Sequence, residues 1–209
     1  MRVLVIGANG QIGQMVVSRL KEKGHEPVAM LRKEEQAQAF EDDGIDTVIA
    51  DLEGDFSHAF EGVDGVIFTA GSGASTGADK TILIDQEGAI EAIDLAKSYE
   101  LDHFVMVSGL GVENPRGVEG EIRPYLHAKH RADEHLIDSG VPYTILRPGL
   151  LTNGEGKGTV TFYEYKGETE YGEIIREDVA DVLVKIIGYP PEDKIYYVVE
   201  GETSISQIL

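Results

Sequence analysis

Short apolar runs alternate with helix-like stretches along most of the chain, and this alternation constrains the fold more than any other feature. The predicted strands are Val3–Ile6, Val28–Leu31, Thr47–Ala50, Val63–Thr69, Phe104–Val107, Tyr143–Leu146 and Ile195–Val199. The predicted helices are Gln11–Lys23, Lys33–Asp42, Phe56–Glu61, Asp79–Tyr99, Pro124–Ser139 and Glu177–Ile187. Strands joined by helices pair in parallel and are covered by helices on both faces. The sequence therefore predicts an α/β fold, with a further short edge strand at Thr159–Tyr165.

The chain reads as one domain over residues 1–209, because no repeat or linker interrupts the pattern. Its 18 Lys and Arg residues oppose 38 Asp and Glu residues, a formal net charge of −20. That charge repels phosphate backbones, and no basic stripe interrupts it, so we expect no nucleic-acid partner. We interpret the acidic excess as a solvated surface rather than an acidic docking face.

The compartment is predicted from what the sequence lacks. Its apolar runs are far shorter than the roughly 18 residues of a membrane helix. Met1-Arg2 leads directly into a strand-like run, without the pattern of a signal peptide. Since the chain also has no Cys, we expect a cytoplasmic protein with no membrane partner. The sequence does not distinguish a monomer from a homo-oligomer.

The first predicted strand runs into a glycine-rich turn, Gly7-Ala8-Asn9-Gly10-Gln11-Ile12-Gly13, which leads into the first predicted helix. In this spacing Gly7 permits a tight exit from the strand, Gly10 lets backbone N–H groups approach a pyrophosphate, and Gly13 lets the helix pack closely on the strand. The phosphate then lies at the positive end of the helix. The position of the turn at the first strand–helix junction favours dinucleotide binding over glycines that only turn a corner.

The end of the second predicted strand indicates which dinucleotide is bound. Sites that prefer NAD place an acid there, about 20 residues after the glycines, to hold the ribose hydroxyls. This chain has Leu31 at that place and Arg32 beside it. A guanidinium binds a 2′-phosphate through paired hydrogen bonds. The sequence thus favours NADP over NAD; the alternative is an exposed Arg32-Lys33 pair that opens a surface helix.

Further short motifs follow the later strands: Ala50-Asp51-Leu52, Ala70-Gly71-Ser72-Gly73, Val107-Ser108-Gly109, Tyr125-x-x-x-Lys129 and Arg147-Pro148-Gly149. With these motifs and the glycine-rich turn, the chain resembles the atypical branch of the short-chain dehydrogenase/reductase superfamily, a group of small NAD(P)-binding proteins related to epimerases and dehydratases. The resemblance covers nearly the whole chain. The resemblance implies a single doubly wound Rossmann domain with a mostly parallel sheet of about seven strands in the order 3-2-1-4-5-6-7.

The resemblance also implies a set of coenzyme-binding residues. Asp51 and Leu52 are expected against the adenine, and the coenzyme backbone is expected beside the turn after the fourth strand. The full expected set is Gly7, Asn9, Gly10, Gln11, Ile12, Gly13, Leu31, Arg32, Asp51, Leu52, Ala70, Gly71, Ser72, Ser108, Lys129, Pro148, Gly149 and Leu150.

The catalytic candidates centre on Tyr125 and Lys129, which are one helical turn apart and so project from one helix face. In the resembled enzymes such a lysine lowers the proton affinity of the tyrosine and holds the nicotinamide ribose, while the phenol exchanges a proton with the substrate as hydride moves. The alternative is a phenol packed in an interface and a solvated lysine. Asp85 stands where related catalytic sites use an Asn, and the resemblance to the atypical branch implies an Asp at this position. Ser108 is expected first as a pocket residue and second as a catalyst.

These residues predict an NADP-dependent oxidoreductase that acts on an unidentified small substrate. About 60 residues follow Arg147-Pro148-Gly149, and we expect residues 150–209 to form a short substrate-side region. Such a region favours a small carbonyl, quinone-like or flavin-like acceptor over a nucleotide sugar. The alternatives are a redox sensor that binds NADP(H) without turnover and an epimerase- or dehydratase-like enzyme. His127, His130 and His135 lack the order of a metal site, so no metal is predicted.

Overall fold

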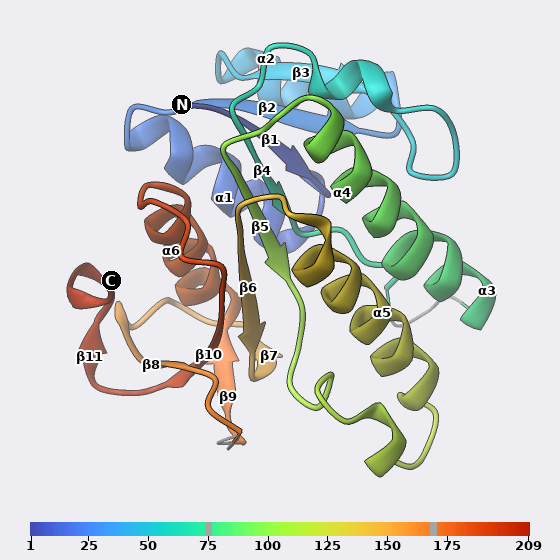
Figure 1. Cartoon of the computed structure of the whole chain (residues 1–209). Coiled ribbons are helices and arrows are strands. Elements are labelled where there is room, and N and C mark those ends of the chain that lie inside the picture. The colour runs from blue at the N-terminus through green and yellow to red at the C-terminus, as the bar shows by residue number, and fades with distance from the viewer. Residues whose placement is uncertain (74–76, 168–170) are drawn as a thin grey trace.

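The computed structural model describes residues 1–73, 77–167 and 171–209, and it places a central sheet between two layers of helices (Figure 1). The strands of the main sheet are β1 (Arg2–Ile6), β2 (Glu26–Leu31), β3 (Asp46–Ile49), β4 (Gly65–Phe68), β5 (His103–Val107), β6 (Tyr143–Pro148), β8 (Thr159–Glu164), β10 (Lys194–Glu200) and β11 (Thr203–Ser204). They are arranged as β11-β8-β10-β6-β5-β4-β1-β2-β3. The predicted α/β Rossmann-like fold is confirmed.

The order of the parallel strands is also the predicted one. From β3 through β2, β1, β4, β5 and β6 to β10, every neighbouring pair is parallel. The predicted number of about seven strands was too low, because the sheet continues to nine. The strand predicted at the edge, β8, pairs antiparallel with β10 and also with β11, so β11 takes the edge.

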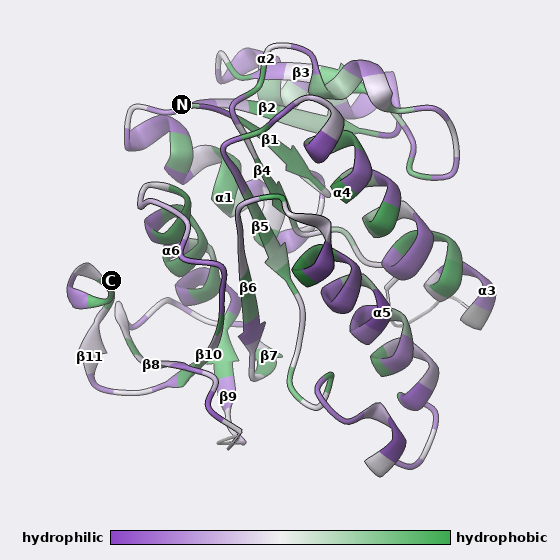
Figure 2. Cartoon of the chain, in the orientation of Figure 1, coloured by the Kyte–Doolittle hydropathy of each residue, from purple (hydrophilic) through white to green (hydrophobic). Residues whose placement is uncertain are grey.

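The helices cover both faces of the sheet. They are α1 (Gln11–Glu22), α2 (Ala37–Asp42), α3 (Ala78–Lys80), α4 (Ala89–Ser98), α5 (Arg123–Ser139) and α6 (Arg176–Ile187). Helices α1 and α6 pack together on one face, and α4 and α5 on the other (Figure 1). Their apolar sides face the sheet and their hydrophilic sides face outward (Figure 2). Each face has its own core, around Val16, Val17 and Leu20 on the first and Ala92 and Ile93 on the second.

Two predicted helices have a different form. The helix predicted over Asp79–Tyr99 contains a π-helical stretch, Thr81–Gly88, between α3 and α4. The apolar pattern of eight residues does not separate this wider winding from an α-helix. The helix predicted over Phe56–Glu61 is a 3₁₀ turn, Ser57–Phe60, since so short a segment rarely propagates as an α-helix.

A small second sheet was not predicted. It pairs β7 (Leu150–Thr152) with β9 (Glu173–Ile175) in parallel. Each strand has three residues, which is too few to display a two-residue period.

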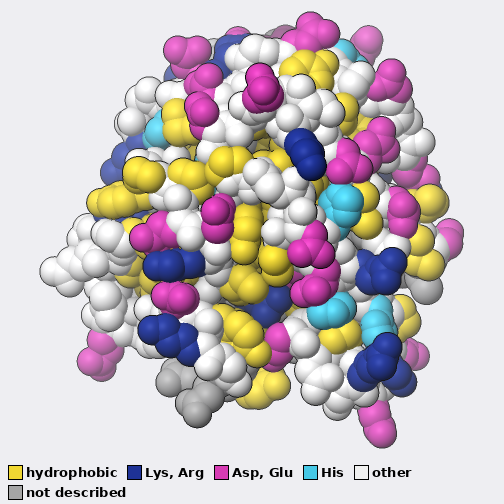
Figure 3. All heavy atoms as spheres, in the orientation of Figure 1, with side chains coloured by type: hydrophobic (Ala, Val, Ile, Leu, Met, Phe, Trp, Pro, Cys, Tyr) yellow, Lys and Arg dark blue, Asp and Glu magenta, His cyan; other side chains and the backbone are white. Residues whose placement is uncertain are grey.

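The face of the molecule in Figure 3 agrees with the solvated interpretation of the acidic excess. On the face that Figure 3 shows, acidic side chains are spread among basic, histidine and apolar ones and do not gather in one patch. Within the described ranges, no helix has the length and apolarity needed to cross a membrane.

Candidate functional site

The glycine-rich turn has the geometry that its spacing predicts. Gly7 ends β1 with φ +87°, and a Cβ there would lie 2.7 Å from the backbone N of Ala70. A Cβ on Gly13 would lie 2.2 Å from the carbonyl oxygen of Gly7, which only glycine allows. Helix α1 begins at Gln11, and in the described structure its N-terminus has no side-chain cap and no acid in its first turn. Its free N–H groups and positive dipole end therefore form a place for an anion.

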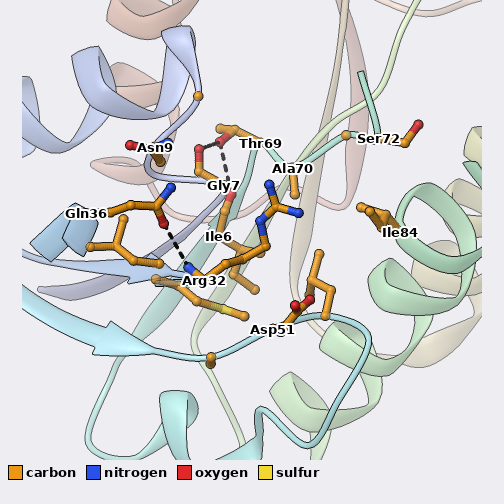
Figure 4. A pocket seen from close by; sticks show the side chains of 16 residues that line it. Ile6, Gly7, Asn9, Arg32, Gln36, Asp51, Thr69, Ala70, Ser72 and Ile84 are labelled. Carbon is orange, nitrogen blue, oxygen red and sulfur yellow. Dashed lines mark hydrogen bonds between the residues drawn. The ribbon is translucent and has the colours of Figure 1, made fainter. Parts of the chain in front are cut away.

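A first hollow lies beside this turn, at the carboxyl ends of the strands from β1 to β4 (Figure 4). Its volume is about 260 Å³. It is lined by Ile6, Gly7, Asn9, Gly10, Met30, Leu31, Arg32, Gln36, Ala50, Asp51, Leu52, Thr69, Ala70, Gly71, Ser72 and Ile84. Residues predicted from the glycine turn, the second strand and the third strand thus meet around one space.

Arg32 lines the first hollow and forms no ion pair with the described residues. Its side chain reaches into the hollow, and its backbone N–H donates to Oε1 of Gln36 at 3.2 Å (Figure 4). Among the described residues, no carboxylate lies within ion-pair distance of its guanidinium, whereas the neighbouring Lys33 pairs with Glu35 at 3.6 Å. An unpaired guanidinium in a chain of net charge −20 is a local site for an anionic group.

A second hollow, of about 620 Å³, continues from the first. Both hollows are lined by Gly10, Thr69, Ala70, Gly71 and Ser72. The other residues around the second hollow are Gln11, Ile12, Gly13, Gly73, Thr81, Val107, Ser108, Glu121, Ile122, Tyr125, Lys129, Leu151 and Arg176. One groove therefore passes the glycine turn and reaches the predicted catalytic pair.

The ammonium of Lys129 is buried and held by strand ends. Its Nζ donates to the carbonyl oxygen of Val107 at 3.2 Å and to that of Ala70 at 3.4 Å. It lies 3.7 Å from Oδ1 of Asp85 and 5.7 Å from the centre of the Phe68 ring. The lysine is thus fixed at the floor of the second hollow and is not the solvated side chain of the alternative interpretation.

The pKa of the Tyr125 phenol is raised from its ordinary value. Burial is the largest cause; the Lys129 ammonium lowers the pKa, and the carboxylates of Asp85 and Asp133 raise it further. The lysine therefore acts in the expected direction, but burial outweighs it. Tyr125 keeps its proton at neutral pH, which suits a proton donor rather than a proton acceptor.

Ser108 belongs to a buried ionic network that the sequence analysis missed. Its hydroxyl donates to Oδ2 of Asp133 at 2.9 Å. The Arg147 guanidinium donates to the same oxygen from Nε at 3.1 Å and from Nη2 at 2.9 Å. Because the Ser108 O–H donates its hydrogen bond to Asp133, the Ser108 oxygen can accept a hydrogen bond from a ligand in the hollow. The spacing of Asp133, four residues after Lys129, contained the signal, since both lie on the helix face of Tyr125.

Some predicted residues lie outside both hollows. Asp85 is fully buried in the π-helical stretch, where its Oδ2 accepts the backbone N–H of Ser72 at 3.0 Å and its Oδ1 has no hydrogen-bond partner in the described structure. The backbone N–H of Gly149 donates to Val198 at 2.9 Å and that of Leu150 to Gly172 at 2.9 Å.

Asp85 holds the turn after β4. Pro148 ends β6, Gly149 joins it to β7 and Leu150 begins β7; the three are not among the described residues that line either hollow. The sequence also indicates a ligand loop at residues 71–78, of which 74–76 lie outside the described residues.

The close approach at Gly13 carries a testable consequence. We expect Gly13→Ala to weaken coenzyme binding about 100-fold, because the added Cβ displaces the start of α1 from the β1 exit and misplaces at least two N–H donors, each worth roughly 1.5–3 kcal/mol to a charged acceptor. Calorimetric titration measures the change. Gly54→Ala is the control, since a Cβ there would meet its nearest atom at 3.7 Å; equal affinities of Gly13→Ala and wild type would show that the turn holds no phosphate.

Comparison with known proteins shows the family to which this chain belongs. A family profile described as NAD(P)H-binding matches residues 7–190. "Uncharacterized sugar epimerase YhfK" of Bacillus subtilis (strain 168) is 43% identical over 214 residues, covering 100% of this chain and 99% of that protein. The structure named "Putative NAD-dependent epimerase/dehydratase from Bacillus halodurans" is 46% identical, with a TM-score of 0.93 over 99% of this chain and 97% of that one.

A more distant structure shares the fold. The oxidoreductase ylbE from Lactococcus lactis is 24% identical and has a TM-score of 0.86, covering 99% of this chain and 94% of that one. Together with the family match, the nearer relatives and the observed groove, this agreement leads to one conclusion. The chain belongs to the NAD(P)H-binding family of Rossmann-fold proteins, in the atypical short-chain dehydrogenase/reductase branch that has epimerase/dehydratase-like members.

Proposed function

We propose that this protein is an NADP-dependent oxidoreductase that acts on a small substrate in the second hollow. The observation that carries the proposal is the placement of the Tyr125 phenol and the Lys129 ammonium in a hollow continuous with the glycine turn. The residues fit the coenzyme: the uncapped start of α1 suits its diphosphate, and the unpaired Arg32 guanidinium suits a 2′-phosphate. When bound, the nicotinamide supplies or accepts a hydride.

The chain's own groups handle orientation and the proton. The buried Lys129 ammonium binds the nicotinamide ribose and carries positive charge at the floor of the hollow. The Tyr125 hydroxyl donates its proton to the oxygen of a carbonyl or quinone substrate, and its raised pKa keeps that proton on the phenol at neutral pH. Ser108 accepts a hydrogen bond through the oxygen that faces the hollow.

The proposal predicts NADPH oxidation in the presence of small acceptors. We expect turnover with at least one member of a panel of aldehydes, quinones and flavins, followed as loss of NADPH absorbance. Tight NADP(H) binding without turnover on any acceptor would instead support the redox-sensor alternative. No binding of the coenzyme at all would exclude both.

The preference for NADP is tested at Arg32. We expect Arg32→Ala to weaken NADP binding about 30-fold, equal to ~2 kcal/mol for a charge-assisted contact, and to leave NAD binding unchanged. Lys33→Ala is the matched control, because Lys33 carries the same charge, pairs with Glu35 and lies outside the residues that line the first hollow. Equal losses for NADP and NAD in Arg32→Ala would refute the 2′-phosphate assignment.

The names of the two nearer relatives favour a second candidate, an epimerase- or dehydratase-like enzyme. That activity needs room for a nucleotide sugar and retention of the coenzyme through the reaction cycle. Incubation with a nucleotide sugar and catalytic NAD or NADP, followed by chromatography of the sugars, tests it. A changed sugar without net coenzyme reduction would replace the oxidoreductase proposal.

A further inference from the structure

Arg176 brings a second guanidinium to the groove, from the side opposite the catalytic pair. It is the first residue of α6, and it lines the second hollow together with Tyr125 and Lys129 of α5. Since α5 and α6 cover opposite faces of the sheet (Figure 1), the hollow lies between groups from both layers. Arg176 comes from the segment 150–209, the region in which the sequence places the substrate side.

Neutral acceptors fix the direction of the Arg176 side chain. Its Nη1 donates to the carbonyl oxygen of Leu151 at 3.2 Å and to Oδ1 of Asn153 at 2.9 Å. A guanidinium has five N–H donors. In the described structure, Nε and Nη2 make no hydrogen bond, so the charged fork keeps donors for a ligand.

The acids that follow Arg176 in sequence are engaged elsewhere. Glu177 accepts from Arg19 at 2.7 Å and from the backbone N–H of Gly156 at 2.8 Å. Asp178 accepts the backbone N–H groups of Lys157 at 3.0 Å and Gly158 at 2.8 Å. These bonds direct both carboxylates to other partners.

The charge of Arg176 is therefore uncompensated, unlike that of the other cation in the hollow. The Lys129 ammonium lies 3.7 Å from Oδ1 of Asp85. In contrast, no carboxylate oxygen of the described residues lies within 4.0 Å of the Arg176 guanidinium, and this includes Glu121, which lines the same hollow. The chain has 38 acidic and 18 basic residues, so most arginines can find an acidic partner. An arginine that lies on a pocket wall and has no acidic partner among the described residues is available for an anionic ligand.

The remaining walls suit an apolar body. Ile12, Val107, Ile122 and Leu151 line the second hollow, and Ile122 is 54% exposed. We propose that Arg176 binds a carboxylate or phosphate group of a substrate whose apolar body packs against these side chains. The inference rests on the proposed function of this hollow as the substrate site, and it names the substrate class: small apolar acceptors that bear one oxyanion.

One other source of an oxyanion is the coenzyme itself, because Gly10 and Gly13 also border this hollow. Measurement of ligand binding and coenzyme binding in the same variants separates the two sources. Binding is also independent of turnover, so a failure of the redox proposal and a failure of the Arg176 proposal give different results.

The experiment compares two matched probe pairs on protein saturated with NADP. The pairs are 4-carboxybenzaldehyde against its methyl ester, and flavin mononucleotide against riboflavin. We expect wild type to bind the anionic member of at least one pair about tenfold more tightly than the neutral member, as one charge-assisted contact provides. Arg176→Gln should abolish this preference, and Arg176→Lys should retain part of it. Arg123→Gln is the control for the lost charge, since Arg123 is exposed at the start of α5 and outside the described lining of the hollow.

Three results would overturn the proposal. Wild type that binds both members of both pairs equally, or binds none, has no oxyanion site in this hollow. An Arg176→Gln variant that keeps the preference moves the site to another residue. An Arg176→Gln variant whose NADP affinity falls while its probe preference stays assigns the guanidinium to the coenzyme. If wild type binds the anionic probe more tightly than the neutral one but oxidises NADPH with no acceptor, only the redox function is refuted.

Discussion

Tyr125→Phe lowers kcat for NADPH-dependent reduction of a carbonyl or quinone by about 10²–10⁴-fold, the usual contribution of a positioned proton donor. The change removes one oxygen and keeps the ring that packs at the hollow. Coenzyme affinity should stay within about twofold of wild type, because the hydroxyl is assigned to the substrate. Steady-state rates on the best acceptor of the panel, with calorimetric coenzyme affinities, measure both quantities.

The raised pKa of Tyr125 gives this prediction a pH dependence. The donor must carry its proton, and burial raises the pKa of the phenol above its ordinary value of 10.0. Activity that depends on Tyr125 should therefore not fall from this cause below about pH 10.

The control and the contrary outcome for Tyr125→Phe are specific. Tyr99→Phe is the matched control, because Tyr99 lies just beyond α4 with its ring tilted against that of Phe60, and it is not among the described residues that line either hollow. Unchanged turnover of carbonyls and quinones in Tyr125→Phe would show that the phenol is not the donor. Activity that survives only with flavins would keep the oxidoreductase class and assign the proton to water.

Arg147→Met lowers the free energy of unfolding by about 3–5 kcal/mol, because it leaves the Asp133 carboxylate buried without its counter-ion. Arg147 is 2% exposed and Asp133 is 0% exposed. Burial raises the pKa of Asp133, against the lowering effect of Arg147 and of the Ser108 hydrogen bond. Urea denaturation at pH 7 measures the loss. The exposed pair of Lys157 and Glu200 supplies the control, since Lys157→Met should cost less than about 1 kcal/mol.

A second variant and a pH series separate charge burial from lost packing. Asp133→Asn combined with Arg147→Met should regain most of the loss, because neither member of this buried ion pair is then charged. In Arg147→Met alone, the folded state holds the Asp133 proton more tightly than the unfolded state does. Its stability deficit should therefore be smallest below the ordinary pKa of 3.8 and grow as pH rises through the raised folded pKa. A deficit that is independent of pH and persists in the double variant would contradict the buried-charge account.

The parts of the fold that the sequence predicts are those with long periodic signals. The parallel strands alternate with helices whose buried residues, such as Val16, Val17 and Leu20, recur at helical spacing. The strands β7, β9 and β11 are not predicted, because segments of two or three residues are too short to show a two-residue period. The π-helical stretch Thr81–Gly88 escapes because its apolar pattern does not separate the wider winding from an α-helix.

In the candidate site too, residues with a local sequence signal are predicted, and residues brought together only by the fold are not. The glycine turn, Arg32 and the pair Tyr125 and Lys129 are recognisable because local spacing carries their chemistry. The partners of Ser108 lie on other elements: Asp133 comes from α5 and Arg147 from β6, and only the fold brings them within hydrogen-bond distance. Arg176 has no motif, and its role emerges from the acids that surround it and are bound elsewhere.

The central claim is that the uncapped start of α1 and the Arg32 guanidinium together bind a phosphorylated dinucleotide. Calorimetric titration of the folded wild-type protein with NADP, NADPH, NAD and NADH tests it most directly. The account predicts saturable binding of one coenzyme per chain, tighter for the two phosphorylated forms, and about 100-fold weaker in Gly13→Ala. Absence of heat with all four nucleotides, on protein whose cooperative unfolding shows that it is folded, would contradict it.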